Sequence, residues 1–209
     1  MMKLYYAETL NPRKVCALAR YLGAPVEFVR VDMGRGQHRT PEFLAMNPNG
    51  KVPVLQTETG TLWESNAILC RLARDDGSDL WPADSDGQIE LLRWLCWDGQ
   101  HFSRHGGTLY FEHIIKPAIG LGGPDAETVE AAIGFMRRHL GVLDAHLQQH
   151  DFVMADRLTV ADFAIGISLP YADRARIPLN DFPAVRRWHD RLCALSGWLD
   201  PFPVARAAA

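Results

Sequence analysis

The stretch from Asn47 to Asn66 constrains the fold of this chain more than any other part of the sequence. Residues 52–55 form a short apolar run rich in β-branched side chains, which predicts a buried strand. Pro53 cannot donate a backbone hydrogen bond, so it belongs at the start or the edge of that strand. If the bond between Val52 and Pro53 is cis, the backbone amide and carbonyl of Val52 point out of the fold, where they can pair with an extended peptide.

A helix is expected to begin near the end of the same stretch. Residues 57–60 predict a turn, residues 62–63 continue as a second strand, and Glu64 with Ser65 opens the helix. The start of a helix presents unpaired backbone amides and the positive end of the helix dipole, so it attracts a carboxylate. We therefore expect this stretch to hold a small peptide through its backbone and a carboxylate together.

The residues before this stretch predict the order of an α/β fold. A strand at 3–6, a helix between Asn11 and Gly23 and a strand at 26–31 imply a parallel β-α-β unit. The pair Thr40-Pro41 marks a further short helix, because threonine is a common cap and proline suits the first helical position. Residues 1–76 thus follow the order β-α-β-α-β-β-α of a thioredoxin-like domain.

The remainder of the chain predicts helices without strands. Residues 77–84 have the composition of a linker, and residues 85–209 that of an all-helical bundle domain. Four helices are expected: two at about 85–109 and 125–150, one opened by a capping signal of Thr159 with Asp162, and one that begins at 181–183. The tail after Gly197 is expected to be loosely ordered.

The totals exclude several classes of function. The chain has 209 residues, of which 47% are apolar and 22% charged. Its net charge is −3 and the sequence contains no run of like charges, so nucleic-acid binding is not expected. No apolar run reaches the length of a membrane span, and the first residues do not resemble a signal peptide. Dispersed cysteines without metal-binding spacing predict reduced, mostly buried thiols in a cytoplasmic protein: Cys16, Cys70, Cys96 and Cys193.

A thioredoxin-like domain followed by a helical domain resembles the cytosolic glutathione transferases, and the resemblance extends over residues 3–195. Three motifs carry it, at 49–55, 64–68 and 158–162. It implies that glutathione is the co-substrate. It also implies a homodimer, with the helix of Ser65 and the long helix after residue 85 at the interface.

The same resemblance assigns roles to individual positions. Val52, which precedes Pro53, would pair with the cysteinyl backbone of glutathione. Glu64 and Ser65 would hold its γ-glutamyl end, and Thr159 with Asp162 would nucleate the helical domain. Two further positions match residues that reach the glycine carboxylate of glutathione: Lys51 and His38.

The chemistry requires that the glutathione thiol ionise before it attacks. An unperturbed cysteine thiol has a pKa of about 8.5, so little thiolate is present at neutral pH. One hydrogen bond to the charged sulfur, worth roughly 1.5–3 kcal/mol, lowers that pKa by about one to two units. A hydroxyl or amide donor at the start of a helix is therefore sufficient, and no general base is required.

The family places this donor just after the first strand. The segment from Ala7 to Asn11 is similar to the bacterial Nu class, in which the Thr-x-Asn pattern is associated with disulfide-bond reduction. The resemblance makes Thr9, through its hydroxyl or amide, and Asn11, through its side chain, the catalytic residues. Tyrosine-type and cysteine-type arrangements do not fit this segment. Asn11 has an alternative interpretation as a helix N-cap, and Cys16 is interpreted as a core residue.

The acceptor substrate is expected against the long helix after residue 85. Trp97, His101 and His105 step along one helical face, and Tyr110 is placed in a loop that follows the helix. His101 and His105 have metal-ligand spacing but lack a third ligand in a defined motif, so no metal is expected.

Three functions fit these residues. The first is conjugation of glutathione to small hydrophobic electrophiles, and the second is glutathione-dependent reduction of a disulfide or peroxide at the same site. The third is a non-catalytic binding or regulatory protein on the same fold. The presence of Glu64-Ser65 favours the two enzymes, and the sequence does not separate one reaction from the other.

Overall fold

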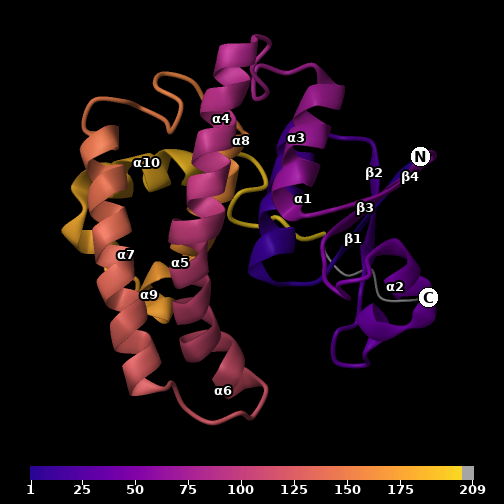
Figure 1. Cartoon of the computed structure of the whole chain (residues 1–209), viewed down its shortest axis with the longest axis horizontal. Coiled ribbons are helices and arrows are strands. Elements are labelled where there is room, and N and C mark those ends of the chain that lie inside the picture. The colour runs from indigo at the N-terminus through magenta and orange to yellow at the C-terminus, as the bar shows by residue number, and fades with distance from the viewer. Residues whose placement is uncertain (204–209) are drawn as a thin grey trace. The chain divides into compact units, whose positions relative to one another are not determined.

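A mixed four-stranded sheet forms the centre of the N-terminal part of the computed structural model, which describes residues 1–203 (Figure 1). Its elements follow the predicted order β-α-β-α-β-β-α, with one added 3-10 turn: β1 (Met2–Tyr6), α1 (Leu10–Leu22), β2 (Val26–Arg30), η1 (Gln37–Arg39), α2 (Pro41–Met46), β3 (Val54–Thr57), β4 (Gly60–Trp63) and α3 (Ser65–Asp76). The expected thioredoxin-like fold class is confirmed.

The sheet has the strand order β2-β1-β3-β4. β1 runs parallel to β2 and antiparallel to β3, which in turn pairs antiparallel with β4. The parallel pair is connected through α1, because a crossover between parallel strands needs a connection of helical length. Leu4 lies opposite Phe28 on one side and Leu55 on the other, which fixes the register at the centre of the sheet.

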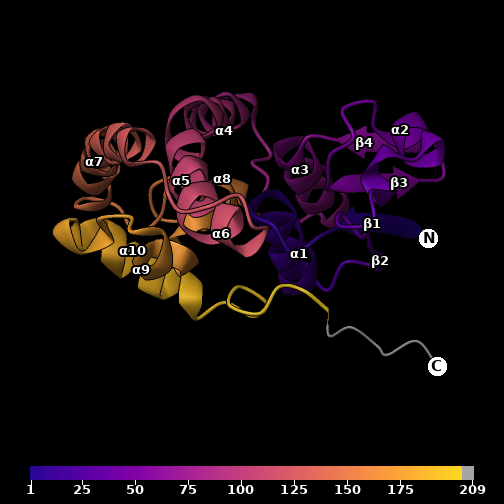
Figure 2. The same cartoon turned by 90° about the horizontal axis from the view of Figure 1, so that it is seen from below.

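The two faces of this sheet are covered by different helices. In Figure 2, α1 and α3 lie together on one side of the sheet and α2 lies on the other. Phe43 of α2 packs with Val54 and with Tyr5, whose ring meets the Phe43 ring edge-on at 6.3 Å. Because neighbouring residues of a strand alternate between faces, Leu4 and Leu55 point to the side of α1 and α3, where both are fully buried.

The helical part contains all the remaining elements. They are α4 (Ser85–Trp97), η2 (Asp98–Phe102), α5 (Ser103–Tyr110), η3 (Phe111–Ile115), α6 (Lys116–Ala118), α7 (Ala126–Leu147), α8 (Val160–Ile165), η4 (Gly166–Tyr171), α9 (Ala172–Ala175), η5 (Leu179–Asp181) and α10 (Pro183–Cys193). The prediction that the first of these helices ends near Leu109 is wrong. Helical turns continue to Ala118 through two π-helical segments, η2 and η3, and such segments are frequent at functional sites.

Asp162 organises the centre of the helical part, and the predicted capping signal is confirmed. It forms a capping box with Thr159 at the start of α8. One carboxylate oxygen accepts from the Val153 amide and from the indole N–H of Trp188, each at 2.9 Å, and the other accepts from the Thr159 amide at 2.8 Å. The side chain is fully buried, so one carboxylate joins α8, α10 and the segment before α8.

The chain divides into two compact units, Met1–Ser78 with the segment that begins at Leu195, and Asp79–Ala194. The expectation of a loosely ordered tail after Gly197 is wrong for the described part of that segment. Trp198 is 1% exposed and its carbonyl accepts a hydrogen bond from the Arg13 guanidinium, while the Phe202 ring stacks on Tyr6 at 5.8 Å. Burial of the Trp198 ring and stacking of the half-buried Phe202 ring offset the entropy of ordering this segment. The final alanines lie outside the described residues.

No helix among residues 1–203 has the length and the apolar character needed to cross a membrane.

Candidate functional site

Thr9 lies at the N-cap position of α1, directly after the first strand and its short loop. Its hydroxyl makes no capping hydrogen bond, whereas its amide donates to the Ala7 carbonyl at 2.7 Å. The sequence predicts that either the hydroxyl or the amide of Thr9 donates to the glutathione sulfur. The amide is already bonded to Ala7. The half-buried hydroxyl is the group that can serve a ligand.

Asn11 lies in the first turn of α1 and contacts the first residue of α3. The Ser65 hydroxyl donates to the Asn11 side-chain oxygen at 3.4 Å, across 54 positions of sequence. The interpretation of Asn11 as an N-cap is wrong, because the helix begins at Leu10 and Thr9 occupies the cap. The starts of α1 and α3 thus meet, and the Asn11 amide nitrogen has no hydrogen bond among the described residues.

Glu64 precedes α3 in a conformation that is unusual for a residue with a side chain. Its φ of 72° and ψ of 111° place it in the left-handed half of backbone space, where a non-glycine residue is strained by about 1–3 kcal/mol. Its carbonyl accepts from the Ile68 amide at 3.0 Å, which opens the helix, and its side chain is exposed. Ser65 is only 8% exposed, so the start of the helix is buried, and the accessible carboxylate of Glu64 lies beside it.

Val52 precedes a cis peptide bond to Pro53, the geometry on which the prediction for this stretch depends. The strand begins two residues later than expected, at Val54, so Val52 lies outside the sheet. Its side chain packs against Val31, Phe43 and Val54, and its backbone has no hydrogen bond within residues 1–203. An unpaired backbone beside a sheet is able to pair with an extended peptide.

Asn47 holds the loop that leads to this position, a role that the sequence analysis did not assign. Its side-chain nitrogen donates to the Lys51 carbonyl at 2.7 Å, and its side-chain oxygen accepts from the Asn49 amide at 3.0 Å. Asn47 is 3% exposed, whereas Lys51 is exposed and its ammonium forms no ion pair among the described residues. The dense run Asn-Pro-Asn-Gly was the signal that could have revealed this loop.

His38 lies in η1, close to the same loop. Gly50 adopts a φ of 59°, and a Cβ at that position would lie 3.1 Å from the His38 carbonyl oxygen. The Nδ1 atom of His38 is buried and has no hydrogen-bond partner in the described structure. A buried orphan nitrogen next to Lys51 is a position where a ligand carboxylate or water could complete the hydrogen bonding.

Lys14 is a second residue that sequence reasoning missed. It is 3% exposed on α1, and its ammonium donates to the Asn66 side-chain oxygen at 2.6 Å. This bond ties α1 to the first turn of α3, one residue after Ser65. The signal available in the sequence was its position four residues from both Leu10 and Leu18, on an apolar helical face, because lysine is rarely buried without a specific partner.

Comparison with known proteins identifies the family of this chain. Residues 1–74 match the family model for the Glutathione S-transferase, N-terminal domain, and residues 105–196 match that for the Glutathione S-transferase, C-terminal domain. Glutathione S-transferase 3 of Zea mays is 33% identical over 198 residues, which cover 90% of this chain and 88% of that protein. The chain belongs to the glutathione S-transferase family.

Two other relatives are similar to this glutathione S-transferase family member over most of its length. The disulfide-bond oxidoreductase YfcG of Escherichia coli (strain K12) is 30% identical over 200 residues, covering 92% of this chain and 90% of that protein. A crystal structure of a glutathione transferase family member from Pseudomonas fluorescens, with two glutathione bound, aligns with a TM-score of 0.84 at 27% identity, covering 96% of this chain and 91% of that one.

The four cysteines of this family member form no disulfide with one another, but they are not all buried as expected. Cys16 is buried in α1, and burial raises the pKa of its thiol to about 12. Burial likewise raises the pKa of Cys70 to about 11. Cys96 is exposed and Cys193 is half-buried, so the expectation of mostly buried thiols holds fully only for Cys16. A thiol with so high a pKa is a poor nucleophile, which supports the core interpretation of Cys16.

Three of the four expected acceptor residues contact α7. The Trp97 and His101 rings lie 6.0 and 5.2 Å from the His139 ring, and the His105 ring stacks on Phe135 at 4.4 Å. Burial lowers the pKa of His105 and of His139, and the nearby His101 and His105 lower the pKa of His139 further. Among the described residues, no group of three or more acidic, histidine or cysteine side chains is arranged to hold a metal ion.

Tyr110 has a different environment, and its expected place in a loop is wrong. It is the last residue of α5, is 7% exposed, and meets the Tyr171 ring edge-on at 4.9 Å. The helix continues past it because η3 and α6 follow without a break. Tyr110 therefore packs against the end of η4 through Tyr171.

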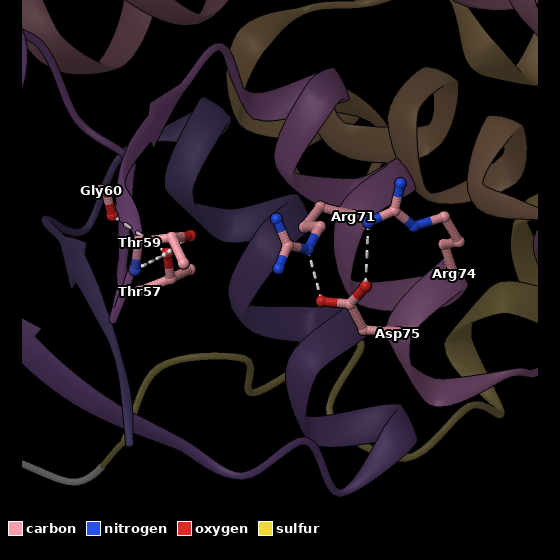
Figure 3. Close-up of polar contacts among 6 residues, drawn as sticks. All are labelled: Thr57, Thr59, Gly60, Arg71, Arg74 and Asp75. Atoms are coloured by element: carbon pink, nitrogen blue, oxygen red, sulfur yellow. Dashed lines mark hydrogen bonds and ion pairs between the residues drawn. The ribbon is translucent and has the colours of Figure 1, made fainter.

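A cavity of about 460 Å³ in the N-terminal unit does not coincide with the candidate site. Its lining includes Arg71 of α3 and Thr57 and Thr59 of the turn between β3 and β4. Figure 3 shows that Arg71 pairs with Asp75 and that the threonines bond within their own turn, Thr57 to Thr59 at 3.2 Å and to the Gly60 carbonyl at 3.1 Å. These polar groups are satisfied by one another, so they do not require a ligand.

Proposed function

We propose that this chain is a glutathione transferase that activates the glutathione thiolate for attack on small hydrophobic electrophiles. The observation that carries the proposal is the contact between Ser65 and Asn11, because it brings the start of α3 to the start of α1. In this proposal Ser65 and Glu64 hold the γ-glutamyl end and Val52 pairs with the cysteinyl backbone. Lys51 and His38 receive the glycine carboxylate.

The reaction needs few groups from the protein. The thiol loses its proton to solvent, and the Thr9 hydroxyl and the Asn11 amide donate hydrogen bonds to the resulting thiolate. The sulfur then forms a bond to the electrophilic atom, and the electron pair leaves with the displaced group or is protonated after addition. The family's glutathione-bound relative supports glutathione as the co-substrate.

Disulfide-bond reduction at the same site is the second candidate, and the resemblance of the Thr9-x-Asn11 segment to the bacterial Nu class favours it. The thiolate would attack a disulfide, forming a mixed disulfide and releasing one thiol. A second glutathione thiolate would then release the other thiol and leave oxidised glutathione. The E. coli disulfide-bond oxidoreductase and the relative with two glutathione bound support this alternative.

One set of measurements separates these proposals from a non-catalytic role. Calorimetric titration with glutathione should show binding. Purified protein should then be assayed with glutathione and either chlorodinitrobenzene or hydroxyethyl disulfide. Turnover of the first acceptor supports conjugation, and turnover of the second supports reduction. Binding without either reaction would favour a non-catalytic protein, and absence of binding would reject both enzymatic proposals.

Ser65→Ala should raise the dissociation constant of glutathione by about tenfold, because a buried hydrogen bond to a charged group contributes roughly 1.5–3 kcal/mol. The turnover number should change little if the hydroxyl holds substrate equally in the ground and transition states. Ser85→Ala is the matched control, since Ser85 is exposed at the first position of α4. Equal affinities in the two variants would show that glutathione does not bind at the start of α3.

We also propose that the protein forms a homodimer, with α3 and α4 at its interface. Ile89 and Leu92 are large apolar side chains exposed on α4, at 66% and 54%, and they lie three residues apart on one helical face. They support the placement of this helix at an interface, because association buries such side chains.

Leu92→Glu should shift the protein toward monomer in sedimentation velocity at micromolar concentration. Leu92 is 54% exposed, so the change places a charge on the proposed interface with little effect on the fold of one chain. Leu121→Glu provides the control, because Leu121 is equally apolar and 61% exposed but follows α6. A wild-type protein that sediments as a monomer would contradict the proposal.

We place the protein in the cytoplasm. Its four cysteines form no disulfide with one another, which supports this location, because a reducing compartment keeps thiols from forming disulfides.

A further inference from the structure

The helical unit carries a group of basic side chains that the proposed activation of glutathione does not use. Figure 1 shows α5 and α7 side by side, and the His139 ring of α7 lies close to the rings of His101 and His105. Arg104 and Arg138 are sequence neighbours of these histidines, and both are exposed. We propose that these five residues, the histidine–arginine cluster, bind a tetrahedral oxyanion such as sulfate or a phosphate group.

His139 is the most buried member of the cluster. It is 8% exposed, and its ring lies 5.2 Å from the His101 ring and 5.8 Å from the His105 ring. Its side chain forms no hydrogen bond with the described part of the chain. Buried polar side chains are generally hydrogen-bonded to protein, water or ligand, so the ring nitrogens of His139 are available to bond to a bound molecule.

The charge of the two helical segments that carry the cluster is entirely positive. Residues 99–111 and 131–143 contain no aspartate or glutamate. The guanidinium groups of Arg104 and Arg138 form no ion pair within residues 1–203. A guanidinium presents several N–H donors that match the oxygens of a phosphate group, and a surface of one charge sign attracts the opposite sign. The cluster therefore favours an anion.

The protonation of the cluster is coupled to this charge. Burial is the main cause that lowers the pKa of His105 and of His139. The other groups that lower these two pKa values are all basic: Arg104, His101, Arg138 and, for His139, also His105. From α4, the side chain in contact with His139 is that of Trp97, which has no charge. Both imidazoles are therefore neutral near pH 7.5, and a bound anion favours their protonated, doubly donating form.

The orientation of the rings favours an oxyanion over a metal ion. The His105 and His139 rings are stacked, and their planes are inclined by only 15°. Nitrogen lone pairs lie in the plane of the ring, so the lone pairs of stacked rings do not converge on one metal ion, which requires each nitrogen at about 2.1 Å. Stacked rings can instead donate N–H groups to separate oxygens of one oxyanion.

The test is calorimetric titration of the full chain with sodium sulfate at constant ionic strength. Sulfate remains a dianion between pH 6 and pH 8, so any pH dependence of its binding comes from the protein. Saturable binding is expected, and the affinity should increase as the pH falls from 7.5 to 6.5, by up to about tenfold for each proton taken up. Titrations in two buffers of different ionisation enthalpy measure that proton uptake. Absence of saturable binding would overturn the proposal, whether or not the protein binds glutathione.

Two variants of the cluster and two matched controls locate the site. Arg138→Gln should weaken sulfate binding by about tenfold, because it removes a charge-assisted hydrogen bond. Arg137→Gln is its control, since Arg137 is paired with Asp181 at 2.8 Å. His139→Gln should reduce the proton uptake, whereas His150→Gln, beyond the end of α7, should leave it unchanged.

Circular dichroism should show that all four variants are folded. Equal sulfate affinity in Arg138→Gln and Arg137→Gln would overturn the site, and undiminished proton uptake in His139→Gln would overturn the role of the buried imidazole. Inorganic phosphate and glycerol 3-phosphate, titrated in the same way, separate two sources of the anion. Binding of both supports a phosphate group carried by a small molecule, and binding of the inorganic ions alone supports a site for the free ion.

Discussion

Thr9→Ala is expected to reduce kcat/KM for glutathione-dependent turnover at pH 7 by about ten- to a hundredfold. The structure leaves the Thr9 hydroxyl as the donor at this position, since the Thr9 amide is already bonded to the Ala7 carbonyl. A hydrogen bond to a charged sulfur is worth roughly 1.5–3 kcal/mol, and its loss raises the pKa of bound glutathione by about one to two units. The measurement is the pH dependence of thiolate absorbance in the binary complex, together with steady-state kinetics.

Thr9→Ser is the matched control, because it retains the hydroxyl and should retain most of the activity. The dissociation constant of glutathione should change little in Thr9→Ala, which separates this residue from Ser65. An unchanged pH profile in Thr9→Ala would assign thiol activation to the Asn11 side chain, whose nitrogen remains available beside Ser65.

Asp162→Ala is expected to lower the free energy of unfolding by about 3–5 kcal/mol at pH 5. The change leaves the amides of Val153 and Thr159 and the indole N–H of Trp188 buried without an acceptor. Each unsatisfied buried donor costs roughly 1–3 kcal/mol, and the helix also loses its capping box. Urea unfolding followed by tryptophan fluorescence measures the loss.

The pH dependence of that loss gives an independent check. Burial raises the pKa of Asp162 to about 6, because desolvation outweighs the hydrogen bonds that favour the carboxylate. A carboxyl whose pKa is higher in the folded state contributes most stability at low pH, and that contribution falls as the pH rises from about 4 through 6. The difference in the free energy of unfolding between wild type and Asp162→Ala should therefore become smaller as the pH rises over this range. Asp173→Ala, at an exposed position, should change stability by less than about 0.5 kcal/mol at every pH.

Local patterns were sufficient to predict most of the N-terminal unit. The alternation of apolar runs with Asn, Thr, Pro and Gly signals predicted the order of its strands and helices, and the capping signal of Thr159 with Asp162 was confirmed. Where local signals compete, prediction was less accurate. Asn11 and Thr9 are both good caps, and the structure selected Thr9 because the chain turns into the helix two residues earlier than the proline suggests.

Interactions between distant residues were not visible in the sequence. Lys14 donates a hydrogen bond to Asn66, and the C-terminal segment contacts Arg13 and Tyr6. The His139 ring contacts three aromatic side chains that precede it in the helical unit. None of these partners is within reach of helical or strand periodicity, because each contact joins elements that are separate in the sequence. The helical turns after Leu109 were not predicted for a different reason, because π-helical segments have no simple periodic signal in the sequence.

The sequence by itself determined the type of site in the stretch from Asn47 to Asn66. A proline after Val52 and a polar helix start at Ser65 are local features, and local sterics and helix termini follow directly from residue type. Only the tertiary structure decided that Asn11 reaches Ser65 and that the Thr9 amide is occupied. It also decided that the His139 ring lies close to the rings of His101 and His105. Those outcomes depend on how elements pack, and packing is a property of the whole fold and not of any one segment.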